Sequence, residues 1–307
     1  MIKVIVVGHA SRCVAWLRKL GASNQQGEAT VDFIDVYYSP RQVSCPDSAS
    51  PSPRKPAWVV ADWIAHDLPI GIVEPIPASR EQLALAHTPS YVDGILSCER
   101  MNGFRGRQED VAESLPWTCG SLLSAARGAL GNGLAACSPT SGFHHAGVDA
   151  GYGYCTFNGL MVTALTLKAE GKVGRVGILD CDQHYGDGTA EIMAAQGTDW
   201  IHHVSQEHWN PGDARPFINT LPEVVRGFEN CDLLIYQAGA DPHLNDPLGG
   251  FLTTAELAER DRIVFSVAKS IGVPVVWNLA GGYQEPLARV LEIHRNTMSA
   301  CIAEYVT

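Results

Sequence analysis

Short, almost entirely apolar runs alternate with helical patterns along most of this 307-residue chain. The strand-like runs are residues 2–8, 30–38, 174–182, 200–205, 231–241 and 273–282. The helical patterns are residues 117–136, 157–170, 190–196, 254–271 and 286–305. Strands that are apolar on both faces and alternate with helices are typical of a parallel sheet covered by helices on both sides. The pattern therefore predicts an α/β fold.

Length and composition indicate a globular protein with a single domain, residues 1–307. Hydrophobic residues make up 46% of the chain and charged residues 18%, which are ordinary values for such a protein. The segment 39–57 is rich in proline and serine and predicts a long surface loop near the N-terminus. The residues before it are too few to build a separate core, so we expect no domain boundary there.

Charge, hydropathy and cysteine usage exclude several classes of function. The net charge of −11 argues against a nucleic-acid-binding surface, which is normally basic. No apolar run approaches the roughly 20 residues that span a bilayer, and the N-terminus lacks the pattern of a secretion signal. The nine cysteines include no C-x-x-C pair, which fits reduced thiols and predicts a cytoplasmic protein.

Polar clusters follow four of the predicted strands. The stretch "ILDCDQHYGDGT" ends an apolar run with three aspartates and a histidine, and "HVSQEH", "GADPH" and "AGGYQ" follow three other runs. Ligands of parallel α/β sheets bind beyond the carboxyl ends of the strands. Because carboxylates at a buried strand end are costly unless they are paired or bound to a metal, the clusters predict one shared site.

The residue types in these clusters are suited to a metal ion. Asp182 and His184 are separated by one residue, so both side chains leave an extended strand end on the same side. Asp241, after another strand, is the natural third ligand. One histidine and two carboxylates suit zinc, or ferrous iron, and leave positions for water and substrate.

Groups suited to acid–base chemistry lie in the same segments. His144 and His145 are adjacent, and Asp180 and Asp187 offer one carboxylate to each. A carboxylate on one imidazole nitrogen fixes the tautomer of a general base. Tyr283 follows two glycines and could donate to a developing oxyanion. Taken singly, the histidine pair is better explained as a packed loop or an incidental pair, and the tyrosine can be a buried phenol with a hydrogen-bonded hydroxyl.

Taken together, "GFHHAG…GYGYCTFNGL", "ILDCDQHYGDGT", "GADPHLNDPLGGF" and "LAGGYQ" resemble the zinc-dependent histone deacetylase family. That family includes bacterial deacetylase-like proteins and acetylpolyamine amidohydrolases. The resemblance runs in order from about Val36 to the C-terminal helix. It implies the three-layer arginase-like α/β fold, with a mostly parallel sheet of about eight strands, and hydrolysis of an N-acylated amine such as acyl-lysine.

The resemblance assigns roles to individual positions. It implies that Asp182, His184 and Asp241 bind zinc, and that His145, oriented by Asp187, is the general base and later the general acid. It makes Tyr283 the group that polarises the scissile carbonyl, and His144, paired with Asp180, an electrostatic partner. It also implies a structural potassium site built from the Ser205 hydroxyl and the backbone around three residues of the metal motif: Asp180, Asp182 and His184.

The substrate pocket departs from the family pattern. Gly153, whose carbonyl would accept the substrate amide hydrogen, and Tyr154, which would form one aromatic wall, match the family. Asp213 and Ala214 stand where the family often has aromatic residues, so we expect a substrate range unlike that of histone-directed members. Leu248 stands where polyamine-preferring members can carry an acidic residue, and is more typical of lysine deacetylases.

Two other functions fit these residues less well. A binuclear ureohydrolase such as arginase needs further acids where this chain has Gly186 and His243. A non-catalytic acyl-ligand binder would be expected to lack a histidine, a ligand or the tyrosine, and none is missing. The residues leave open whether the amine is a protein lysine, a polyamine or a small metabolite. They also leave open the oligomeric state.

Overall fold

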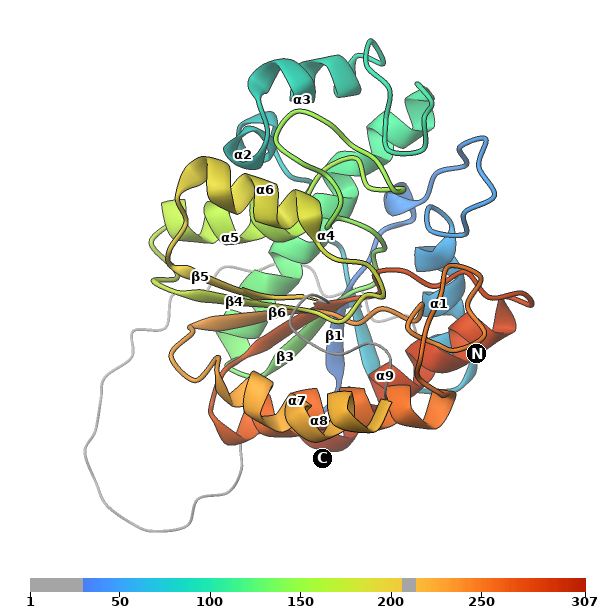
Figure 1. The fold of residues 1–307 in the computed structure, drawn as a ribbon, viewed down its shortest axis with the longest axis vertical. Helices are drawn as coiled ribbons and strands as arrows, with labels where there is room; N and C mark the ends of the chain where they lie inside the picture. The colour runs from blue at the N-terminus through green and yellow to red at the C-terminus, as the bar shows by residue number, and fades with distance from the viewer. Residues whose placement is uncertain (1–29, 206–213) are drawn as a thin grey trace.

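The computed structural model describes residues 30–205 and 214–307 (Figure 1). Its strands form one sheet in the order β2-β1-β3-β7-β6-β4-β5, and every pairing is parallel. The strands are β1 (Ile34–Tyr37), β2 (Ile70–Val73), β3 (Ala135–Ser138), β4 (Val176–Asp180), β5 (Ile201–Val204), β6 (Leu233–Gln237) and β7 (Val275–Asn278). The parallel α/β prediction is confirmed, with seven strands in the described residues against about eight expected. The apolar run 2–8 lies outside those residues.

Helices cover both faces of the sheet. They are η1 (Pro40–Gln42), α1 (Lys55–Ala65), α2 (Arg80–Ala86), α3 (Pro89–Leu96), α4 (Glu109–Asn132), α5 (Gly159–Ala169), α6 (Asp187–Gln196), α7 (Ala214–Arg226), α8 (Thr254–Ser270) and α9 (Ala288–Tyr305). In Figure 1, α4, α5 and α6 lie on one side of the sheet and α7, α8 and α9 on the other. No helix among the described residues combines the length and the hydropathy needed to cross a bilayer.

Alternating side chains of the central strands divide the interior into two cores. Leu233 and Ile235 of β6 pack with the helices on one face, and Leu234 and Tyr236 pack with those on the other. Because successive strand residues point to opposite faces, a strand buried on both sides must be apolar throughout. This explains why the central strands appear in the sequence as continuous apolar runs.

Strands β2 and β3 and helices α1, α2, α3 and α7 were not predicted from the sequence pattern. Both strands are only four residues long, and β3 has the sequence "AACS", which lacks the β-branched and aromatic residues that favour strands. Tertiary pairing places them in the sheet: β3 lies between β1 and β7, and β2 pairs with β1 at its edge.

The segment 39–57, for which a surface loop is predicted, is irregular over most of its length but is partly buried. It contains η1 and the first turn of α1, and the side chains of Gln42, Ser44, Ser52 and Lys55 are buried. Serine hydroxyls bond to backbone within the segment, so its polar groups can leave water. The Pro- and Ser-rich composition thus reflects an irregular path against the domain rather than exposure to solvent.

Candidate functional site

Loops that follow neighbouring strands meet at the carboxyl edge of the sheet. β4 lies between β5 and β6, and β7 lies on the other side of β6. The segment after β4 carries Asp182 and His184, the one after β6 carries Asp241, and the one after β7 carries Tyr283. Strand order therefore brings these residues, from three separate parts of the sequence, to one place.

Asp182, His184 and Asp241 form a group that fits a divalent cation. Each offers one ligand atom, and these atoms all lie within 4.8 Å of one another. The Nδ1 atom of His184 lies 3.1 Å from Asp182 Oδ1 and 3.4 Å from Asp241 Oδ2. Asp241 is fully buried, yet its Oδ2 atom makes no hydrogen bond. A buried carboxylate oxygen without such a partner is costly, and a bound cation would remove that cost.

The charges in this group also favour a cation. Burial, together with the adjacent Asp182, raises the pKa of Asp241 to about 7. The hydrogen bond with Asp182 and the nearby Asp241 carboxylate raise the pKa of His184 to about 10. Two carboxylates this close need positive charge beside them, which His184 supplies by holding a proton. A divalent ion would take over that role, and its binding would release the His184 proton.

The backbone holds both carboxylates in place. The Gly281 amide donates to Asp182 Oδ2 at 2.8 Å, and the Gln183 amide donates to Asp241 Oδ1 at 3.2 Å. A Cβ atom on Gly281 would collide with the Asp241 carboxylate, so this close approach requires glycine. The "AGG" before Tyr283 therefore lets the chain pass directly behind the metal ligands.

Each of the two adjacent histidines is paired with a carboxylate. His144 Nδ1 lies 2.8 Å from Asp180 Oδ2, and His145 Nδ1 lies 2.7 Å from Asp187 Oδ1. The two imidazole rings lie 4.1 Å apart, centroid to centroid. The structure thus brings together the pairs that the sequence suggested, with one ring nitrogen of each histidine held by its carboxylate.

The two histidines differ in pKa. Burial alone would lower the pKa of His144, but the Asp180 and Asp182 carboxylates outweigh it and raise the pKa to about 9. Burial and the neighbouring His144 lower the pKa of His145, against the opposing effect of Asp187. At neutral pH the arrangement therefore favours a charged His144 beside a neutral His145, which is the form of imidazole that accepts a proton.

Tyr283 lies beside the metal-ligand group and is held at several points. Its backbone amide donates to Asp246 Oδ2 at 2.8 Å. Burial, reinforced by Asp241 and Asp182, raises the pKa of Tyr283 well above the usual value for a phenol. The ring lies 5.7 Å from that of Tyr154, centroid to centroid. The phenol therefore stays a donor at neutral pH.

The remaining predicted residues lie around this centre. Gly153 has a φ of +57°, and a Cβ atom there would come within 2.6 Å of His145 Cδ2, so this glycine packs directly against the histidine ring. Leu248 is partly exposed, and its amide donates to Asp246. Ser205 accepts a hydrogen bond from the Gly186 amide. Of the two positions where the family often has aromatic residues, Ala214 begins α7, and Asp213 lies outside the described residues.

The family model for the histone deacetylase domain matches residues 58–214 and 212–298. The chain belongs to the histone deacetylase family. Members are in general metal-dependent, and family membership makes this chain a deacetylase-type hydrolase. The resemblance seen in the sequence motifs is thereby confirmed.

Individual relatives agree with the family assignment. An uncharacterized protein of Picosynechococcus sp. is 29% identical over 283 residues, which cover 81% of this chain and 94% of that protein. Histone deacetylase 2 of Arabidopsis thaliana is 26% identical over 72% of this chain. Histone deacetylase 10, chloroplastic, of Oryza sativa is 28% identical over 67%. The matches span 65% and 58% of these two plant proteins.

Solved structures share the fold. The HDA15 HD domain superposes with a TM-score of 0.74 at 18% identity and covers 90% of each chain. An acetylpolyamine aminohydrolase from Burkholderia pseudomallei superposes with a TM-score of 0.70 at 19% identity, over 89% of this chain and 99% of that one. At such identities the likeness supports the fold alone.

Lys55 is a residue of this histone deacetylase fold that sequence reasoning missed. Its side chain is fully buried, and its Nζ atom donates to the Ala280 carbonyl at 2.7 Å. Burial lowers the pKa of Lys55 to about 8, although Asp241, Asp182 and Asp246 act in the opposite direction. Lys55 thus places a cation beneath the acidic site. Its position inside a Pro- and Ser-rich segment carried no signal of this role.

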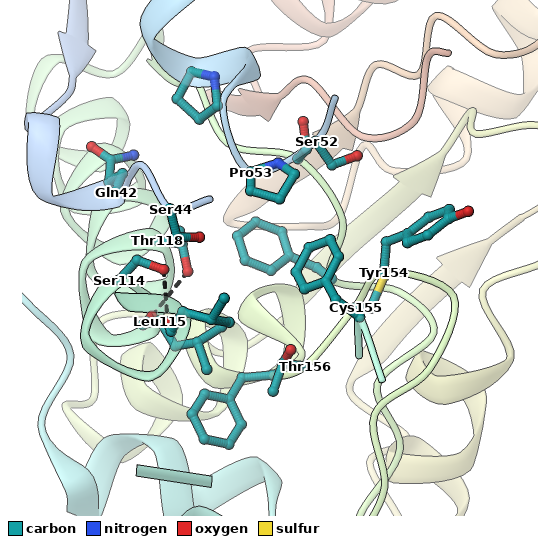
Figure 2. A pocket seen from close by; sticks show the side chains of 16 residues that line it. Gln42, Ser44, Ser52, Pro53, Ser114, Leu115, Thr118, Tyr154, Cys155 and Thr156 are labelled. Atoms are coloured by element: carbon teal, nitrogen blue, oxygen red, sulfur yellow. Dashed lines mark hydrogen bonds between the residues drawn. The ribbon is translucent and has the colours of Figure 1, made fainter. Parts of the chain in front are cut away.

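A cavity with both polar and apolar walls lies on the Tyr154 side of the site (Figure 2). Hydroxyl groups from the 39–57 segment, from α4 and from nearby loops line it: Ser44, Ser52, Ser114, Thr118, Ser141 and Thr156. Two atoms of the residues that line the cavity, Ser141 Oγ and Gln42 Nε2, have no hydrogen-bond partner among the described residues. Cavities with unpaired polar walls hold ordered water. Since Tyr154 lines the cavity and its ring lies beside that of Tyr283, the cavity adjoins the catalytic candidates.

Proposed function

We propose that this chain is a zinc-dependent amidohydrolase that removes an acyl group, such as acetyl, from an N-acylated amine such as acyl-lysine. The observation that carries the proposal is the convergence of Asp182, His184 and Asp241 beside the His145–Asp187 pair. We assign residues 1–307 to one catalytic domain. A non-catalytic acyl-ligand binder is less well supported, since such a protein has no use for a positioned base.

The three ligand residues are proposed to hold Zn²⁺, with Fe²⁺ as the alternative that the same donor set accepts. A bound ion would supply Lewis acidity toward water and the amide carbonyl. We also propose a structural K⁺ at the backbone of Asp180, Asp182 and His184 with the Ser205 hydroxyl. The hydrogen bond from Gly186 to Ser205 supports this, because it brings that hydroxyl to the same loop.

His145 is proposed to move the protons. Asp187 holds its Nδ1–H, which leaves Nε2 to accept a proton from the attacking water and later to donate it to the leaving amine. His144 remains charged beside it and stabilises negative charge in the transition state. Tyr283 donates from its phenol to the oxyanion that develops on the carbonyl, which its raised pKa permits at neutral pH.

Pocket residues bear on the substrate. We propose that the Gly153 carbonyl accepts the substrate amide hydrogen and that Tyr154 forms one wall of the acyl channel. Leu248 presents an apolar side chain and no charge for a polyamine, which favours an acyl-lysine. An acetylpolyamine or a small N-acetyl metabolite is the alternative substrate. The likeness in fold to an acetylpolyamine aminohydrolase is the reason to include acetylpolyamines in the test.

The test is the initial rate of the zinc-loaded protein on acetyl-lysine peptides, longer acyl-lysines, acetylpolyamines and small N-acetyl metabolites. Tyr283→Phe is expected to lower kcat on the preferred substrate by about 10²- to 10³-fold, the effect of losing one oxyanion donor. KM should change little, since the donor acts in the transition state. Turnover that survives this substitution, or no turnover in the panel with zinc bound, would contradict the proposal.

The pH dependence should report His145. This residue acts as a base only when neutral, and its pKa lies below the ordinary value of 6.5, so kcat/KM should rise through a midpoint below pH 6.5. Asp187→Asn removes a charge that raises this pKa, so the midpoint should move to lower pH while the plateau also falls. Kinetics from about pH 4.5 to 8 measure both effects. A midpoint that moves to higher pH in the variant would count against His145 as the base.

A further inference from the structure

We propose that Tyr152 is a positioning residue for the general base: its phenol holds the second carboxylate oxygen of Asp187, and Asp187 in turn fixes the His145 ring. The inference rests on the proposed function of His145. It adds a third member to the pair that the sequence motifs indicated.

The contacts form a continuous chain. Asp187 Oδ1 lies 2.7 Å from His145 Nδ1, and Asp187 Oδ2 accepts a hydrogen bond from Tyr152 Oη at 2.6 Å. The Tyr152 ring also lies against the imidazole of His145, with 4.9 Å between centroids. Tyr152 therefore touches both members of the pair and leaves neither oxygen of Asp187 without a partner.

The neighbouring His144–Asp180 pair explains why Asp187 needs this help. Asp180 is fully buried, and the Asp182 amide and the Gln237 side chain both donate to its Oδ1 atom while Oδ2 faces His144. The side chain of Asp187, in contrast, is 44% exposed. Water can compete for an exposed carboxylate and let it rotate. A phenol on Oδ2 opposes that rotation.

The backbone around Tyr152 keeps the phenol in place. Gly153 and Tyr154 are consecutive residues with positive φ, at +57° and +66°, and they form a tight turn closed by a 2.9 Å hydrogen bond from the Cys155 amide to the Tyr152 carbonyl. This turn lies directly against the His145 ring at Gly153. The base, its carboxylate and the phenol are thus held by two segments, the turn at 152–155 and the start of α6.

Tyr152 is not a core residue. The residue is 53% exposed, so its ring contributes little to the buried apolar surface. Its hydroxyl, on the other hand, has a specific partner, and the hydrogen bond to Asp187 raises the pKa of Tyr152 to about 12, which keeps it protonated. Removing only the hydroxyl should therefore affect the pair and leave the fold intact.

The test is Tyr152→Phe in the zinc-loaded protein. On the preferred substrate, kcat is expected to fall about tenfold while KM stays within twofold. Tenfold is the lower end of the range for residues that act by hydrogen-bonding to the residues of a metal site. Zinc content and the midpoint of thermal unfolding should match the wild type. An unchanged kcat would overturn the inference, and so would a rise in KM alone or a loss of zinc or of stability that accounts for the rate.

A second readout does not depend on turnover. In protein labelled with ¹⁵N-histidine, the Nδ1–H resonance of His145, assigned by its absence in His145→Gln, should shift or broaden in Tyr152→Phe. The Nδ1–H resonance of His144 is the internal control and should not move, because its partner Asp180 is held by the Asp182 amide and the Gln237 side chain. An unmoved His145 resonance would overturn the inference. If the wild type hydrolyses nothing in the panel, the proposed function fails, yet this spectrum still decides the role of Tyr152.

Discussion

Asp241→Asn is expected to weaken binding of the divalent ion by more than about 100-fold and to reduce turnover to background. A loss of about 100-fold is the upper end of the range for residues that only hydrogen-bond to a metal ligand, and a ligand itself should cost more. Asp241 is the ligand in the group whose Oδ2 atom is fully buried and makes no hydrogen bond. An asparagine has the same shape but no charge, so it cannot supply the negative oxygen that the ion requires. Zinc content after dialysis against a competing chelator, and the rate on the preferred substrate, measure the two effects.

The matched control is Asp199→Asn, the same change at an exposed aspartate. It should retain both zinc and activity. The stability of the metal-free forms separates loss of the ion from misfolding. Because the folded-state pKa of Asp241 is raised, its ionisation opposes folding near neutral pH, so the metal-free variant should unfold no earlier than the metal-free wild type. Full zinc occupancy in Asp241→Asn would refute the ligand assignment.

Lys55→Met is expected to lower the free energy of unfolding of the metal-free protein by about 3 kcal/mol, as when one partner of a buried charge network is removed. The substitution leaves the Ala280 carbonyl without its donor and removes a cation that, together with the protonated His184, offsets the charge of the nearby carboxylates: Asp182, Asp241 and Asp246. A bound divalent ion would neutralise the same carboxylates. The loss should therefore be smaller in the zinc-loaded protein, about 1–2 kcal/mol, which is the cost of the unpaired carbonyl.

Urea unfolding with and without zinc measures this difference. Lys168→Met is the matched control, because Lys168 also donates to a backbone carbonyl, that of Gly174 at 2.7 Å, but from an exposed position. It should cost less than about 1 kcal/mol in either state. Equal losses for Lys55→Met with and without zinc would show that Lys55 acts only through its hydrogen bond and not through its charge.

Much of the fold could be predicted from local pattern. The continuous apolar runs at β4, β6 and β7 indicated a sheet buried on both faces, and the strand order places their carboxyl ends side by side. The short strands β2 and β3 lacked such a signal, because their place depends on pairing with neighbours rather than on their own residues. The apolar run 2–8 lies outside the described residues and is not tested.

The chemical groups of the site were also visible in the sequence. Asp182 and His184 are separated by one residue and His144 and His145 are adjacent, and together their types favoured metal binding and proton transfer. Spacing could not show how water reaches each group. Asp180 and Asp187 cannot be told apart by their places in the sequence motif. In the structure Asp180 is fully buried, whereas Asp187 is partly exposed to solvent and accepts a hydrogen bond from Tyr152.

The sequence by itself determined the class of fold and the kinds of side chain at the centre, since periodicity and residue type are local properties. Only the tertiary structure decided what surrounds that centre. Lys55 donates a hydrogen bond to Ala280, 225 residues further along the chain. The segment 39–57, whose composition predicts exposure, lines the cavity beside the site. Burial and electrostatic fields are sums over neighbours in space, and neighbours so distant in the chain leave no mark in a local pattern.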